Sequence, residues 1–130
     1  MRNLLAICAL IFFTASQVSA TEVSIIKTEF EHSVNGWTVM VTLEHPDTGW
    51  SHYADAWRIV DKSGKELGKR VLYHPHEDEQ PFTRSLSAVN IPKQTSIVYI
   101  EAHCKVDGWS SKRLRVDLTQ NKGAGFVVQH

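Results

Sequence analysis

The stretch Ile97-Val98-Tyr99-Ile100-Glu101-Ala102-His103-Cys104-Lys105 decides the fold class. Its apolar residues alternate with polar or amphipathic ones, and a period of two places successive side chains on opposite faces of a β-strand. The stretch therefore predicts a strand that buries Val98, Ile100, Ala102 and Cys104. On such a face a free thiol behaves as a small hydrophobe. We expect Cys104 to be buried, and it could ligate a metal only if it also faced the loops.

Six further segments outside this stretch predict strands. They alternate in the same way, and Gly, Pro, Asn or Asp separates them. The segments are 23–30, 37–44, 56–61, 66–73, 82–89 and 112–118. No segment has sustained helical spacing. Seven short strands with Trp57 in the third are typical of an immunoglobulin or fibronectin type III sandwich. The sequence thus predicts an all-β fold, a single antiparallel β-sandwich of about seven strands.

The first 20 residues have the pattern of a cleavable signal peptide. Arg2 precedes an apolar run over residues 4–13, and Val18-Ser19-Ala20 supplies the small residues of a cleavage site. The run is shorter than the roughly 20 residues that a membrane-spanning helix needs. We expect a signal peptide over 1–20, a sandwich domain over 21–118, and a tail or edge strand over 119–130. The protein should be periplasmic or secreted, with no membrane anchor after cleavage.

The charge and cysteine content argue against a nucleic-acid-binding protein and against a domain held by an internal disulfide. Without Arg2 the chain has 13 Lys and Arg against 14 Asp and Glu, and the two signs are mixed along it. Nucleic-acid binding rests on a basic stripe, so we expect no nucleic-acid partner. Cys104 would be the single cysteine left after removal of Cys8 with the signal peptide, so no internal disulfide is predicted.

Histidines are frequent, and topology predicts that many of them lie together. The chain contains seven. In an up-and-down order of strands, the loops over 45–55, 74–81 and 106–111 emerge at the same end of the sandwich. These loops hold His45, Asp47, several other candidate ligands and three aromatic residues, and binding sites are commonly built on such loops.

His74-Pro75-His76 is the sharpest motif, because Pro75 restricts the backbone that carries two imidazoles. Neutral imidazole binds zinc and copper well, and nearby carboxylates complete or orient such sites. We predict a copper or zinc site formed by His52, His74 and His76, with His103, Glu77 or Glu79 assisting. Alternatively, His74 and His76 are ordinary loop residues, the acidic run is simply solvated, and His103 is an outward strand residue paired with a carboxylate.

The loop aromatics give a competing prediction. Trp50, Tyr53 and Trp109 could bind a carbohydrate or a protein partner, or they could cap the open end of the core. Ser51-His52 beside Asp55 lacks the structural context of a catalytic motif. We therefore expect a binding protein and not an enzyme.

Two motifs carry a resemblance to other proteins. Residues 49–57, Gly-Trp-Ser-His-Tyr-Ala-Asp-Ala-Trp, and residues 74–86, which begin His-Pro-His-Glu-Asp-Glu-Gln-Pro-Phe-Thr-Arg, look like those of an uncharacterised family of small exported bacterial proteins. The resemblance spans about residues 49–109. It implies export and the same fold, and it implies no activity or cofactor.

Overall fold

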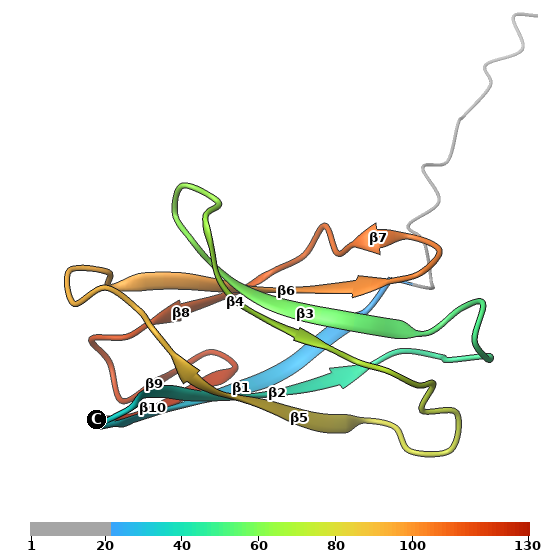
Figure 1. Cartoon of the computed structure of the whole chain (residues 1–130), viewed down its shortest axis with the longest axis horizontal. Helices are drawn as coiled ribbons and strands as arrows, with labels where there is room; N and C mark the ends of the chain where they lie inside the picture. The colour runs from blue at the N-terminus through green and yellow to red at the C-terminus, as the bar shows by residue number, and fades with distance from the viewer. Residues whose placement is uncertain (1–21) are drawn as a thin grey trace, which may run out of the picture.

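The computed structural model describes residues 22–130, which form two β-sheets packed face to face (Figure 1). The predicted signal peptide lies outside these residues. The first sheet has the order β5 (Phe82–Val89), β2 (Gly36–Glu44), β1 (Ser24–Ser33), β10 (Phe126–Gln129) and β9 (Lys122–Gly123). The second has the order β4 (Glu66–Val71), β3 (Ala54–Asp61), β6 (Ile97–Cys104) and β7 (Gly108–Trp109), and β8 (Leu114–Asp117) also pairs with β6.

The core lies between the two sheets and follows the alternation in the sequence. Val98, Ile100, Ala102 and Cys104 of β6 are each 0% exposed, which confirms the burial predicted for this face. Trp57 of β3 is also fully buried and belongs to the same apolar cluster. The prediction of an all-β sandwich is therefore confirmed. Within residues 22–130 no helix is long and apolar enough to cross a membrane.

The sheets are not wholly antiparallel, which corrects one prediction. β10 pairs with β1 in parallel, with Thr28 opposite Phe126 and Phe30 opposite Val128. Phe126 and Val128 point into the core and are 7% and 3% exposed. The segment 119–130, expected to be a tail or an edge strand, thus supplies β9 and β10. Together with the two-residue β7, these short strands raise the number from about seven to ten.

The strand order also differs from the up-and-down order that was expected. The chain crosses from one sheet to the other between β2 and β3, between β4 and β5, between β5 and β6, and between β8 and β9. Successive long strands still alternate in direction. The β2–β3, β4–β5 and β6–β7 loops therefore emerge at one end, at the right of Figure 1, as the sequence predicted.

The buried face of β10 yields a first prediction. Phe126→Ala should lower the free energy of unfolding by roughly 3 kcal/mol, because it removes a large buried side chain and leaves a cavity. Val127, on the opposite face of the same strand, is 40% exposed, so Val127→Ala should cost less than about 1 kcal/mol. Urea unfolding of both variants measures the difference. Equal losses would show that the inner face of β10 adds nothing to the core.

Candidate metal centre

Three loops meet at the end of the sandwich where β2 and β6 finish and β3 begins. They cover residues 45–53, 72–81 and 105–107. The first contacts the second because the His76 backbone N–H donates to the Asp47 carboxylate over 2.8 Å. It contacts the third because the Lys105 backbone N–H donates to the Tyr53 carbonyl over 3.2 Å. Beside this contact, His52 Nε2 lies 4.0 Å from Sγ of Cys104, the last residue of β6. These contacts join residues that are far apart in the sequence into one site.

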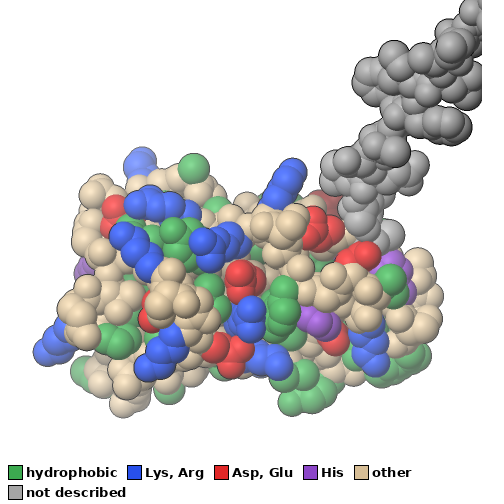
Figure 2. Space-filling model, turned by 90° about the horizontal axis from the view of Figure 1, so that it is seen from above, with side chains coloured by type: hydrophobic (Ala, Val, Ile, Leu, Met, Phe, Trp, Pro, Cys, Tyr) green, Lys and Arg blue, Asp and Glu red, His purple; other side chains and the backbone are tan. Residues whose placement is uncertain are grey.

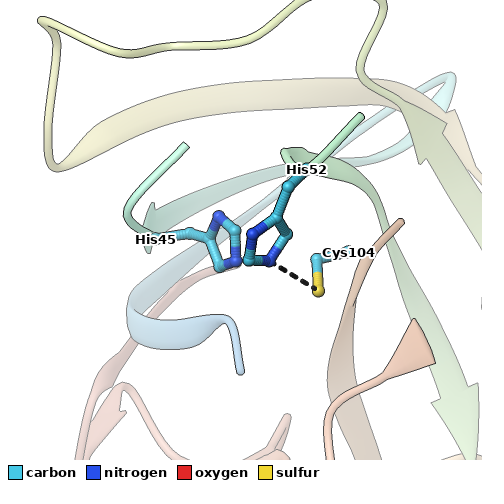
Figure 3. Close-up of side chains that lie close together, drawn as sticks. All are labelled: His45, His52 and Cys104. Atoms are coloured by element: carbon cyan, nitrogen blue, oxygen red, sulfur yellow. Dashed lines mark hydrogen bonds between the residues drawn. The ribbon is translucent and has the colours of Figure 1, made fainter. Parts of the chain in front are cut away.

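Within the described residues, one group of three potential metal ligands has its donor atoms all within 4.8 Å of one another. It consists of His45, His52 and Cys104, and Figure 3 shows their side chains converging from separate segments. His45 is 1% exposed and Cys104 is 0% exposed, whereas His52 is half-buried. The group therefore lies at the end of the core, with His52 on its solvent side.

Asp47 fixes the tautomer of His45. Its Oδ1 lies 2.5 Å from His45 Nδ1 and also accepts the Ala54 backbone N–H over 3.0 Å. Because a carboxylate oxygen accepts, Nδ1 donates to it, and the neutral imidazole then has its lone pair on Nε2. That Nε2 is buried and has no hydrogen-bond partner. A buried unsatisfied nitrogen is costly and demands an explanation, and a metal ion would supply the missing partner.

A tight turn presents His52. The Thr48 backbone N–H donates to the His52 carbonyl over 3.0 Å, and the His52 N–H donates to the Gly49 carbonyl over 3.2 Å. Gly49 has a φ of 136°, a conformation that side-chain-bearing residues rarely adopt. The turn sets the His52 ring against that of His45, with ring centroids 4.9 Å apart and planes at 79°.

Cys104 ends β6 and is held by the loop that follows it. The backbone N–H of Asp107 donates to its sulfur over 3.3 Å, and Asp107 Oδ2 lies 3.7 Å from the same atom. Burial is the main cause that raises the pKa of the Cys104 thiol, while the backbone N–H groups of Asp107 and Val106 act in the opposite direction. The thiol is thus protonated at neutral pH unless a cation replaces the proton.

Of the predicted ligands, His52 belongs to this group, and the His74-Pro75-His76 motif lies beside it. His76 is 5% exposed and stacks on Phe82 with ring centroids 4.0 Å apart. Its Nε2 accepts from Arg84 Nη2 over 2.8 Å, so that nitrogen already has a partner. His74, Glu77 and Glu79 are exposed. Glu79 lies 3.9 Å from Arg84, and the His74 ring lies 4.6 Å from that of His76.

His103 points out of the sandwich, on the face of β6 opposite Cys104. Its Nδ1 lies 2.5 Å from Asp55 Oδ1, which is the carboxylate pairing that the sequence left open as an alternative to ligation. The centroid of its ring also lies 5.0 Å from that of Trp109. The Arg58 guanidinium stacks over the Trp109 ring, with Cζ 3.8 Å from the ring centroid. Charged side chains of both signs are interspersed on the face that Figure 2 shows.

The three aromatics proposed as a binding surface are not equivalent. Trp50 is 66% exposed, but Tyr53 is only 6% exposed, and their ring centroids lie 5.9 Å apart. Trp109 packs between Arg58 and His103. Trp50 alone among them presents most of its ring to solvent.

Sequence reasoning did not select His45 and Cys104 as ligands. The available signal was that His45 and His52 flank one loop and that Cys104 ends a strand which antiparallel pairing brings to the same end. The register places Cys104 opposite Ala54, at the start of β3 directly after that loop. Cys104 was correctly predicted to be buried, and its position at the strand end lets the same sulfur face the loops.

The chain is similar to a known protein and to a solved structure. No protein-family model matches the chain. A protein of Halomicrobium mukohataei described as "Putative lipoprotein" is 37% identical over 89 residues, which cover 68% of this chain and 42% of that protein. The chain thus spans less than half the length of this relative. A superoxide reductase (1Fe-SOR) from Giardia intestinalis has 19% sequence identity and a TM-score of 0.45, and the match covers 73% of this chain and 99% of that structure.

The environment of His76 predicts how stability depends on pH. Burial, and next the Arg84 guanidinium, lower the pKa of His76 from its usual 6.5. The unfolded chain therefore takes up a proton at a higher pH than the folded protein does. The free energy of unfolding should fall as the pH drops below about 6.5 toward the lower folded pKa. Urea unfolding between about pH 8 and pH 5 measures this slope.

His76→Gln should make that slope shallower, since the variant has no imidazole to protonate. His74→Gln is the matched control, because it removes an exposed imidazole two residues away. An unchanged slope in His76→Gln would refute a role for His76 in the acid response.

Proposed function

We propose that this chain is an exported protein that binds a single transition-metal ion through His45, His52 and Cys104. The observation that carries the proposal is the hydrogen bonding of the two ring nitrogens of His45. Asp47 holds its Nδ1, and its buried Nε2 has no hydrogen-bond partner. The residue shares a cluster with an imidazole and a thiol. Metal-ligating histidines are typically oriented in this way by a carboxylate that accepts from the nitrogen away from the metal.

The geometry fits a metal after a small adjustment. Bonds of about 2.0 Å to imidazole nitrogen and about 2.3 Å to sulfur place donors roughly 3.5–4 Å apart. His52 Nε2 and Cys104 Sγ are already 4.0 Å apart, and all three donor atoms lie within 4.8 Å of one another. A small rotation of the half-buried His52 ring would bring the donors to bonding distance, while His45 stays fixed by Asp47.

Two imidazoles and one thiolate suit copper or zinc. A trigonal set of this composition is typical of copper electron-transfer sites, and zinc takes the same donors when a fourth ligand completes a tetrahedron. Asp107 Oδ2 lies 3.7 Å from the sulfur, and this proximity supports Asp107 as the proposed fourth ligand. We propose copper as the metal of the three-residue site, and zinc as the metal favoured when Asp107 joins it.

Two observations support export. Residues 1–20 have the order of a charged residue, an apolar run and small residues that signal peptidases read. The Halomicrobium mukohataei relative is described as a lipoprotein, a class of protein that is exported. We propose that the mature chain acts as a binding protein in the periplasm or the medium.

A titration of the untagged chain from Thr21 to His130 tests the metal site. Copper(II) and zinc(II) should bind stoichiometrically, and copper should give an intense visible thiolate-to-metal absorption. His52→Ala and Cys104→Ser should each lower the affinity at least about 100-fold, because each removes a ligand. His103→Ala and His74→Ala are matched controls and should bind as the unmodified chain does. Weak, non-stoichiometric binding, or equal losses in the controls, would overturn the proposal.

Metal binding should also depend on pH. The thiol must lose its proton to bind, and burial raises its pKa, so affinity should rise with pH through the neutral range. At pH 7, uptake of zinc(II) should release about one proton from Cys104. Proton release in a weakly buffered solution measures this number. Cys104→Ser should release fewer protons than the unmodified chain, and the same number in both would exclude the thiol as a ligand.

A further inference from the structure

The His74–Arg84 segment was the sharpest sequence motif, yet its imidazoles lie outside the three-residue metal site. Its contacts show that Gln80 bridges this segment to His45. The His45 backbone N–H donates to Gln80 Oε1 over 3.0 Å. The same side chain donates through Nε2 to the His76 carbonyl over 2.8 Å. One amide thus ties the backbone of a proposed ligand to a buried residue of the neighbouring loop.

A second bridge links the same two residues through the Asp47 side chain. Asp47 Oδ1 contacts the His45 ring, and Asp47 Oδ2 accepts the His76 backbone N–H over 2.8 Å. Gln80 therefore fixes the backbone of His45, and Asp47 fixes its ring. Both bridges end on His76.

His76 provides a rigid end for the two bridges. Its ring stacks on Phe82 with an interplanar angle of 11°, and Arg84 donates to its Nε2. The ring is nearly completely buried, with 4% of the side chain exposed. These contacts lock the loop at the point where Gln80 and Asp47 attach.

We propose that Gln80 is a positioning residue of the metal site and that it holds His45 with Nε2 facing His52 and Cys104. Within the motif His-Pro-His-Glu-Asp-Glu-Gln-Pro-Phe-Thr-Arg, Gln80 and His76 then belong to the outer shell of the site, and the motif supplies no ligand itself. This inference rests on the proposed function. It assigns a role to the segment that the three ligands leave unexplained.

Gln80→Met tests the role, because methionine has a similar length and lacks both amide groups. It should weaken zinc(II) affinity by about 10–100-fold, the usual effect of losing an outer-shell partner. Gln80→Glu keeps an oxygen acceptor for the His45 N–H but loses the donor to the His76 carbonyl, so its affinity should lie between that of Gln80→Met and that of the unmodified chain. His74→Gln changes an exposed residue of the same motif and should leave affinity unchanged. Competition with a chelator measures all four proteins, and circular dichroism checks that each is folded.

A second readout separates positioning from a merely structural role. Nitrogen NMR of the metal-free protein should show His45 as the single tautomer protonated on Nδ1. Gln80→Met should give a mixture of tautomers, because a His45 backbone released from Gln80 lets the ring move away from the Asp47 carboxylate that holds the Nδ1 proton. Cobalt(II) spectra of the loaded proteins should show an altered ligand field for Gln80→Met and a smaller change for Gln80→Glu. Gln80→Ser gives the same comparison if Gln80→Met does not fold.

The proposal is overturned if a folded Gln80→Met keeps the original affinity and the original His45 tautomer, or if His74→Gln weakens binding as much. Failure of the proposed function would look different, since the unmodified chain itself would then bind no metal stoichiometrically. The tautomer comparison needs no metal, so it would still decide whether Gln80 positions His45.

Discussion

The carboxylate of Asp47 is the interaction on which the loop end of this molecule depends. It is 7% exposed, and a buried charge is tolerated only when hydrogen bonds replace its water. The His45 ring, the Ala54 N–H at the start of β3 and the His76 N–H provide those bonds. Since the three partners come from different parts of the chain, satisfying one side chain fixes the relative position of two loops and a strand.

A binding site requires that its residues lie together and that their donor atoms are correctly oriented. Different parts of this structure meet the two requirements. The strands fix where Cys104 and the end of the 45–53 loop lie, because the pairing of β3 with β6 sets Cys104 opposite Ala54. The polar contacts among Asp47, Gln80 and His76 then set how His45 is oriented. The scaffold therefore determines which residues meet, and a small buried polar network determines which atoms face each other.

The sequence predicted the sandwich because an alternating pattern such as that of 97–105 is a local property that the chain cannot satisfy in a helix. It could not predict the pairing of β10 with β1. The run over 126–128 is short, and its partner lies about a hundred residues away, so no local pattern identifies that partner. The predicted site at His74 and His76 differs from the three-residue group for a related reason. Two histidines separated only by Pro75 made 74–76 conspicuous, but Arg84 donates to His76 Nε2, and no local pattern in the sequence predicts that tertiary hydrogen bond.

The parallel pair of β1 and β10 has a consequence for how the chain is made. Synthesis delivers β1 first and β10 last, so one edge of β1 has no partner strand until residue 126 and its neighbours emerge. Exposed strand edges invite pairing with other chains. The nascent protein should therefore be most open to aggregation, and most dependent on a holding chaperone, over the whole interval before its last strand appears.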